Sequence, residues 1–184
     1  MIKKLCLIFS LTAVSFIASH DRLTSIADIN ATINHISREK TAVVLFAQKT
    51  LIIYKRAKSM LKSSLHEHYS PLKKAVKKVL NNIIASDEFS YSINKVTDYQ
   101  TECIVNQHMM FDDITYDSMD YPIGEKINQE LALTFPELNH TINTAFNIFY
   151  VTLVNCRGCQ LLLEKLRLKE QQLTAEIEAL QTKD

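Results

Sequence analysis

A chain of 184 residues with only two glycines and three prolines is too poor in turn-forming residues for a sheet fold or a nucleotide-binding α/β fold. It has no Gly-rich phosphate loop and no internal repeat, and its formal net charge is +1. Its length suits one domain, and its composition favours a domain built from helices.

The first 19 residues have the three-part pattern of a secretory signal peptide. Two lysines precede an uncharged, mostly apolar run over residues 5–17, which ends in Ala18 and Ser19. As a helix this run would span only about 20 Å, whereas a membrane core is roughly 30 Å thick. We therefore expect a signal peptide over 1–19, secretion of a single helical domain of residues 20–184, and no membrane span.

The segment 22–69 is predicted to be one long helix, because it contains no glycine or proline and repeats apolar residues at spacings of three, four and seven. Lys40 and Lys58 fall on the same stripe, so we expect a kink or a break near one of them. The stripe consists of Leu23, Ile26, Ile29, Ile33, Ile36, Val43, Ala47, Leu51, Tyr54, Leu61 and Leu65.

Two shorter helices are predicted next. Ser70 has the character of a cap for a helix that starts at Pro71 and ends near Ile84. Ser86 can cap a third helix, which continues to about Met110. The inner side of this third helix is predicted to carry Phe89, Ile93, Val96, Cys103 and Ile104.

The segment 112–124 indicates a loop, and a brief helix is predicted over 125–133. Residues 134–137 have the spacing of a capping box, so we expect the last helix to begin here. A seven-residue repeat of mostly apolar residues then continues to the end of the chain, and such a seam is typical of a helix beside a partner helix. One position of the seam holds Ile142, Phe149, Cys156, Leu163, Glu170 and Ile177, and the other holds Leu138, Ala145, Thr152, Cys159, Leu166, Leu173 and Leu180. We predict an all-α, elongated helical bundle with long first and last helices packed antiparallel and a coiled-coil-like C-terminal end.

The end of the last helix is the predicted contact surface for a protein partner or a second copy. Its candidate residues are Leu163, Leu166, Leu173, Ile177 and Leu180. The first functional hypothesis is therefore a secreted, non-enzymatic protein that acts through its surface or a coiled-coil-like interaction. We expect no catalytic residues, no metal and no cofactor. No nucleophile motif occurs, and although His108 and Asp112 have an i, i+4 spacing, the acidic residues of 112–120 lack the spacing and the glycine of an EF-hand loop.

Charge is strongly segregated along the chain. Residues 21–80 hold 12 basic and 4 acidic side chains, whereas residues 81–140 hold 2 and 11. Export argues against nucleic acid as the partner of the basic part. The predicted helix 71–84 sets lysines opposite apolar residues, and such helices either pack in a bundle or bind lipid surfaces. The second functional hypothesis is a carrier of a lipid or other apolar ligand.

Three cysteines, Cys103, Cys156 and Cys159, remain after signal-peptide cleavage. In an oxidising compartment we expect a disulfide between Cys103 and one of the other two, which leaves one thiol over. The spacing of Cys156 and Cys159 also supports a third hypothesis, a thiol redox protein in which a helix N-terminus lowers the pKa of the first thiol. The apolar run 146–154 would then be a strand.

Two sequences match the acceptor pattern for N-linked glycosylation. They begin at Asn30 and Asn139. Because the chain is rich in asparagine, serine and threonine, one or two such matches arise by chance, and they apply only to an exported eukaryotic protein.

Overall fold

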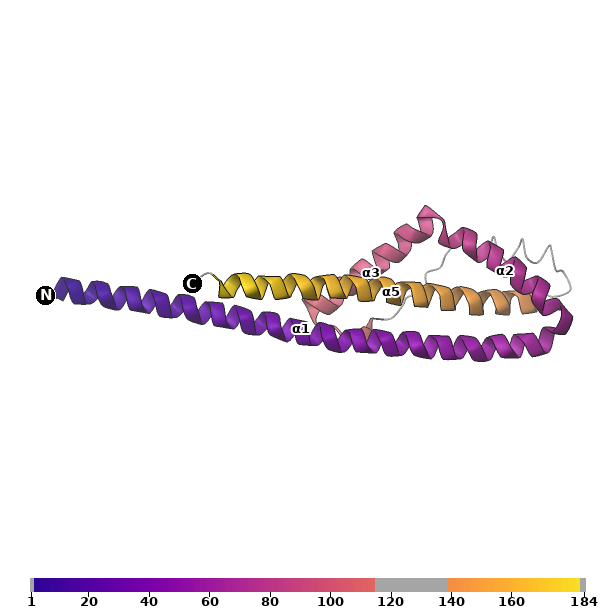
Figure 1. The fold of residues 1–184 in the computed structure, drawn as a ribbon, viewed down its shortest axis with the longest axis horizontal. Coiled ribbons are helices and arrows are strands. Elements are labelled where there is room, and N and C mark those ends of the chain that lie inside the picture. Colours follow the sequence, from indigo (N-terminus) through magenta and orange to yellow (C-terminus); the bar gives the residue numbers. More distant parts are fainter. Residues whose placement is uncertain (1, 115–138, 183–184) are drawn as a thin grey trace.

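The computed structural model describes residues 2–114 and 139–182, and in these two ranges the chain is helical with no strand. The elements in chain order are α1 (Ile2–Leu65), η1 (His66–His68), α2 (Tyr69–Ile84), α3 (Asp87–Gln107), η2 (Phe111–Asp113) and α5 (Asn139–Gln181). The long helices α1 and α5 lie antiparallel side by side, and α2 and α3 form an arch over α5 (Figure 1). The predicted all-α bundle is confirmed.

The helix α1 continues unbroken past both lysines on its apolar stripe, so the predicted break is absent. The Nζ of Lys40 lies 2.5 Å from Oε2 of Glu170, which is the charged residue on the seam of α5. Ser37 donates a 2.8 Å hydrogen bond to the other carboxylate oxygen. The hydrogen bond from Lys40 is the main reason why the pKa of Glu170 lies below its ordinary value. The ammonium of Lys58 lies 5.9 Å from the centre of the Tyr54 ring.

The first helix ends four residues earlier than predicted, at Leu65. His66 takes a left-handed conformation with φ 45°, which stops the helix and starts the tight turn η1. This turn leads directly into α2, whose N-cap is His68 and has no side-chain cap. The predicted Ser70 cap is therefore wrong. Ser70 and Pro71 lie in the first turn of α2, where the missing N–H of proline costs little.

The predicted cap of the third helix is confirmed, because Ser86 Oγ accepts a 3.2 Å hydrogen bond from the Phe89 N–H. The helix α3 ends at Gln107 and not near Met110. The reason is His108, whose left-handed φ of 50° ends the helix. The predicted brief helix and capping box in the segment 125–137 lie outside the described residues.

The core consists of two clusters of buried apolar side chains. The first cluster joins the end of α1 to α2, the first part of α3 and the first part of α5, and consists of Leu61, Leu65, Leu72, Val76, Leu80, Ile83, Phe89, Ile93, Ala145 and Val154. The second cluster lies where α3 ends and consists of Ile36, Val43, Cys103, Ile104, Phe111, Ile114, Cys159, Leu162 and Leu166. Burial of these faces explains why the amphipathic helices pack as they do.

A glycine inside α5 lets α3 approach closely. Gly158 is buried and lies seven residues, or two helical turns, before Lys165. Lys165 donates hydrogen bonds to the Asp98 carboxylate (2.6 Å) and the Asn94 carbonyl (3.1 Å), both on α3. Gly158 therefore faces α3 as well, and its missing side chain leaves room for that helix.

A buried polar cluster on α1 holds the turn η2. Glu39 is 3% exposed, and its Oε2 accepts a 2.7 Å hydrogen bond from the Phe111 N–H. His35 is also buried, and its Nε2 lies 3.2 Å from the Met109 carbonyl oxygen. Arg38 joins the cluster from the surface, with Nη2 2.8 Å from Nδ1 of His35 and Nε 3.4 Å from Oε1 of Glu39.

The described residues contain no helix long and apolar enough to cross a membrane.

Candidate ligand-binding groove

The predicted disulfide is wrong, because no two of the three cysteines lie at disulfide distance. Cys103 and Cys159 are buried among the apolar side chains of the second core cluster. Cys156 is half-buried and faces the space between α1 and α2. The helix therefore directs Cys156 away from α3, which carries Cys103.

The cysteine pair also lacks two features on which the redox hypothesis depends. The run 146–154 is helical, so the pair lies inside α5 and not at a helix N-terminus. Burial raises the pKa of the Cys156 thiol, which lowers its thiolate fraction at neutral pH. This geometry gives the redox hypothesis no support.

The predicted contact residues on α5 lie mostly along the seam with α1. Leu166 is fully buried in the second core cluster. Leu163 and Leu173 pack partly buried against the same cluster, and Ile177 and Leu180 are half-buried. Since α1 already packs along this seam of α5, the seam offers less surface to a helix of a partner molecule than the sequence predicts.

The other predicted sites stay untested. Asn30 is exposed on α1, whereas the side chain of Asn139 lies outside the description, so glycosylation at both remains a prediction. Over the ranges 2–114 and 139–182, no group of three or more His, Cys, Asp or Glu side chains is placed to hold a metal ion.

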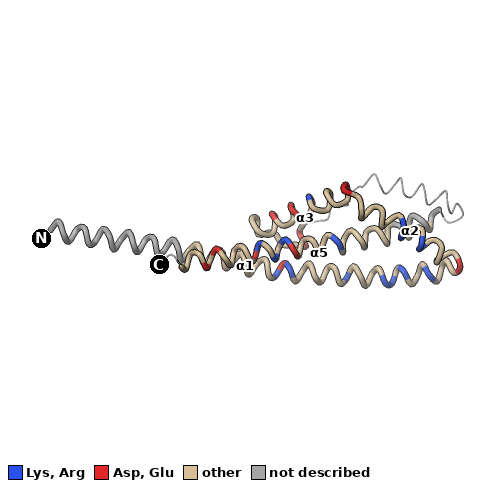
Figure 2. Tube along the Cα trace, turned by 45° about the horizontal axis from the view of Figure 1, so that its top comes forward, with Lys and Arg blue, Asp and Glu red and all other residues tan. Residues whose placement is uncertain are grey.

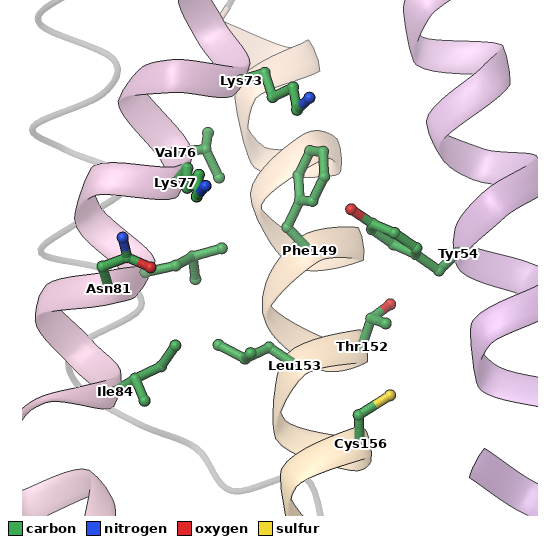
Figure 3. A pocket seen from close by; sticks show the side chains of 11 residues that line it. Tyr54, Lys73, Val76, Lys77, Asn81, Ile84, Phe149, Thr152, Leu153 and Cys156 are labelled. Carbon is green, nitrogen blue, oxygen red and sulfur yellow. The ribbon is translucent and has the colours of Figure 1, made fainter. Parts of the chain in front are cut away.

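An open groove of about 400 Å³ lies between α1, α2 and α5. Its floor is formed by Phe149 and Leu153 of α5, one helical turn apart. Val76 and Leu80 contribute one wall from α2. Tyr54 contributes the other wall from α1, and Figure 3 shows Val76 and Tyr54 on either side of Phe149. The surface of the groove is predominantly apolar and suits the tail or body of an apolar molecule.

On the α1 side of the groove, the ring of Tyr54 packs against the ring of Phe149 on the floor. The rings of Tyr54 and Phe149 meet edge to face with centroids 5.5 Å apart. Burial, and to a lesser extent the nearby Tyr69, raises the pKa of Tyr54 above its ordinary value. In Figure 3 the Tyr54 hydroxyl points toward Phe149, where it can donate a hydrogen bond to a bound polar group.

Two lysines line the α2 side of the groove. Lys73 and Lys77 are four residues apart, so they lie on one face of α2 next to the apolar wall. Lys74 and Lys78 are exposed and do not line the groove. None of the described lining residues is acidic. The groove therefore combines an apolar floor with a cationic edge.

The surroundings of the groove are basic. Figure 2 shows Lys and Arg along α1 near the turn and on α2, whereas Asp and Glu gather on α3. Between Glu39 and Asp87 the sequence has a single acidic residue, Glu67. None of the basic residues from Lys55 to Lys78 forms an ion pair within the part of the chain that the structure describes.

The groove was not found by sequence reasoning. A lysine pair beside buried apolar residues was visible in the predicted helix 71–84, but every amphipathic helix shows that pattern.

Comparisons of the chain with models of protein families, with curated proteins and with solved structures find no match.

Proposed function

We propose that this protein is a secreted, non-enzymatic carrier that binds an apolar molecule in the groove between α1, α2 and α5. The observation that carries the proposal is an open groove of about 400 Å³ whose floor is Phe149 and Leu153. Ligand sites in proteins are mostly apolar concavities of roughly 300–1,000 Å³ with a few polar groups at defined places. Lys73, Lys77 and the Tyr54 hydroxyl are such groups.

Binding of a neutral apolar dye tests this proposal. We expect Nile red, excited in the visible range, to gain fluorescence with the full chain. Replacing Asn81, at the edge of the groove, by the larger side chain in Asn81→Trp should weaken the affinity by about tenfold. The matched control is Asn82→Trp, because Asn82 is also exposed on α2 but does not line the groove.

Equal affinities of the two variants, or no binding by the unmodified chain, would contradict a carrier function. Native mass spectrometry of the purified protein gives a second readout. A carrier should retain apolar material that adds a discrete mass, and Asn81→Trp should retain less of it than Asn82→Trp.

A second candidate function is self-association through the faces of α1 and α3. Large apolar side chains are exposed along one stretch of α1: Val44, Leu45, Leu51, Ile52, Ile53 and Met60. Lys49 and Arg56 lie among them, whereas the exposed side of α3 combines Tyr91 and Tyr99 with acidic residues. These opposite charges favour a contact between α1 of one copy and α3 of the next.

Self-association predicts a mass that rises with protein concentration and falls with added salt. The double substitution Leu45→Glu plus Ile52→Glu should keep the chain monomeric, because it places negative charges on the face that would meet an acidic helix. Sedimentation equilibrium measures this mass. If the unmodified chain has the mass of a single chain at every concentration, self-association is excluded as its function.

A further inference from the structure

The ligand class follows from the charges around the groove, provided that the groove binds an apolar molecule at all. Two cationic side chains, Lys73 and Lys77, lie one helical turn apart on the α2 side. Neither forms an ion pair with a carboxylate among the described residues. Both side chains are exposed, so their ammonium groups stay in water while their methylene stems cover apolar surface.

The lining admits an anion but opposes a cation. No acidic side chain of the described chain lines the groove, and α2 contains none at all. A positively charged headgroup would therefore meet like charge and find no partner. An anionic headgroup would meet two ammonium donors and, across the groove, the hydroxyl of Tyr54 (Figure 3).

The size of the groove favours one hydrocarbon chain. A volume of about 400 Å³ lies near the lower end of the range for ligand pockets. Phe149 and Leu153 follow each other along α5 and form a continuous apolar strip beside Val76 and Leu80 of α2. A single extended chain can cover this strip while its headgroup remains at the open, cationic edge.

We infer that the ligand is a single-chain amphiphile with an anionic headgroup, such as a long-chain carboxylate, held by Lys73 and Lys77 with its chain over Phe149 and Leu153. This inference rests on the proposed carrier function and adds the charge of the headgroup and the number of chains. Recognition depends on the negative charge, which a carboxylate, a sulfate or a phosphate monoester can supply.

Three probes with the same twelve-carbon chain test the inference: dodecanoate, dodecanol and dodecyltrimethylammonium. The two ionic probes are titrated below their micellar concentrations, and dodecanol below its solubility limit, against Nile red bound to the full chain. We expect dodecanoate to displace the dye at a concentration about tenfold lower than dodecanol, and the ammonium probe to be the weakest. A double-chain anionic phospholipid should compete less well than its single-chain counterpart.

Charge reversal on α2 locates the headgroup. In the variant Lys73→Glu plus Lys77→Glu we expect the preference for dodecanoate over dodecanol to disappear, because dodecanoate loses much more affinity than dodecanol does. The control variant Lys74→Glu plus Lys78→Glu changes the net charge equally, about 100° further around α2 and outside the groove lining, and should keep the preference. Circular dichroism confirms that both variants fold, and Lys73→Gln plus Lys77→Gln provides a milder version.

The outcomes separate the two proposals. If neither the dye nor any probe binds, the carrier function itself is wrong. If the dye binds but dodecanoate and dodecanol compete equally well, the carrier function stands and the anionic ligand class is wrong. If both charge-reversed variants lose the preference to the same extent, attraction is a property of the whole basic surface and the assignment to Lys73 and Lys77 fails.

Discussion

Replacing Leu166 by alanine is expected to lower the free energy of unfolding by about 2–5 kcal/mol. Leu166 has no exposed surface and lies in the second core cluster with Ile36, Val43 and Leu162, where α1 and α5 meet. Truncation removes apolar burial and leaves a cavity that the surrounding helices fill only in part. Urea unfolding followed by circular dichroism at 222 nm measures the loss.

The matched control for this substitution lies two residues away. Leu168 is on the same helix but is 58% exposed, so Leu168→Ala should change the free energy of unfolding by at most about 0.5 kcal/mol. Equal losses in the two variants would contradict the packing of α5 on α1. The comparison also tests the predicted contact surface for a partner. A large loss for Leu166→Ala would mean that Leu166 stabilises the fold of its own chain and is not available for contact with a second molecule.

The buried face of a helix could be predicted from the sequence where the spacing of apolar residues is unambiguous. The helix α2 buries Leu72, Val76, Leu80 and Ile83, the stripe that its sequence predicts. In α1 the same reasoning fails for Leu51, which is 44% exposed. Leu51 follows Val43 by two steps of four residues, and each such step turns about 40° around a straight helix, so Leu51 lies about 80° from the buried Val43.

Polar residues on the seams were the harder part of the prediction. Lys40 on α1 and Glu170 on α5 each interrupt an apolar stripe, and a single helix read alone suggests a break. The structure places them together, so each is the partner of the other. Thr97 and Gln100 were likewise missed as buried residues of α3, because polarity alone argues against burial.

The groove depends on information that no single helix contains. The periodic pattern places Phe149 and Cys156 on the seam of α5, yet both also line the space left between α1 and α2. That space exists because α2 leans away from α1 along the arch, which depends on the turn η1 and on the packing of α3 (Figure 1). Helix periods predict which face is buried but not how far apart two helices diverge.

The buried carboxylate of Glu39 was also missed by sequence reasoning, because an acidic residue beside Lys40 resembles a solvated helix face. In the structure it is the acceptor that satisfies the backbone N–H of Phe111 at 2.7 Å. Phe111 itself is buried in the second core cluster and packs edge to face on Phe46 with centroids 5.6 Å apart. The carboxylate thus positions an aromatic core residue through its backbone.

Glu39→Ala is therefore expected to cost about 2–3 kcal/mol, because it removes a charge-assisted hydrogen bond and leaves a buried N–H without a partner. Glu39→Gln should cost less, since its amide oxygen can still accept from the Phe111 N–H. Arg38 is largely exposed and can turn to water in both variants. Hydrogen exchange at the Phe111 amide should accelerate strongly in the alanine variant and only modestly in the glutamine variant. Equal protection of this amide in all three proteins would show that Glu39 does not hold η2 in place.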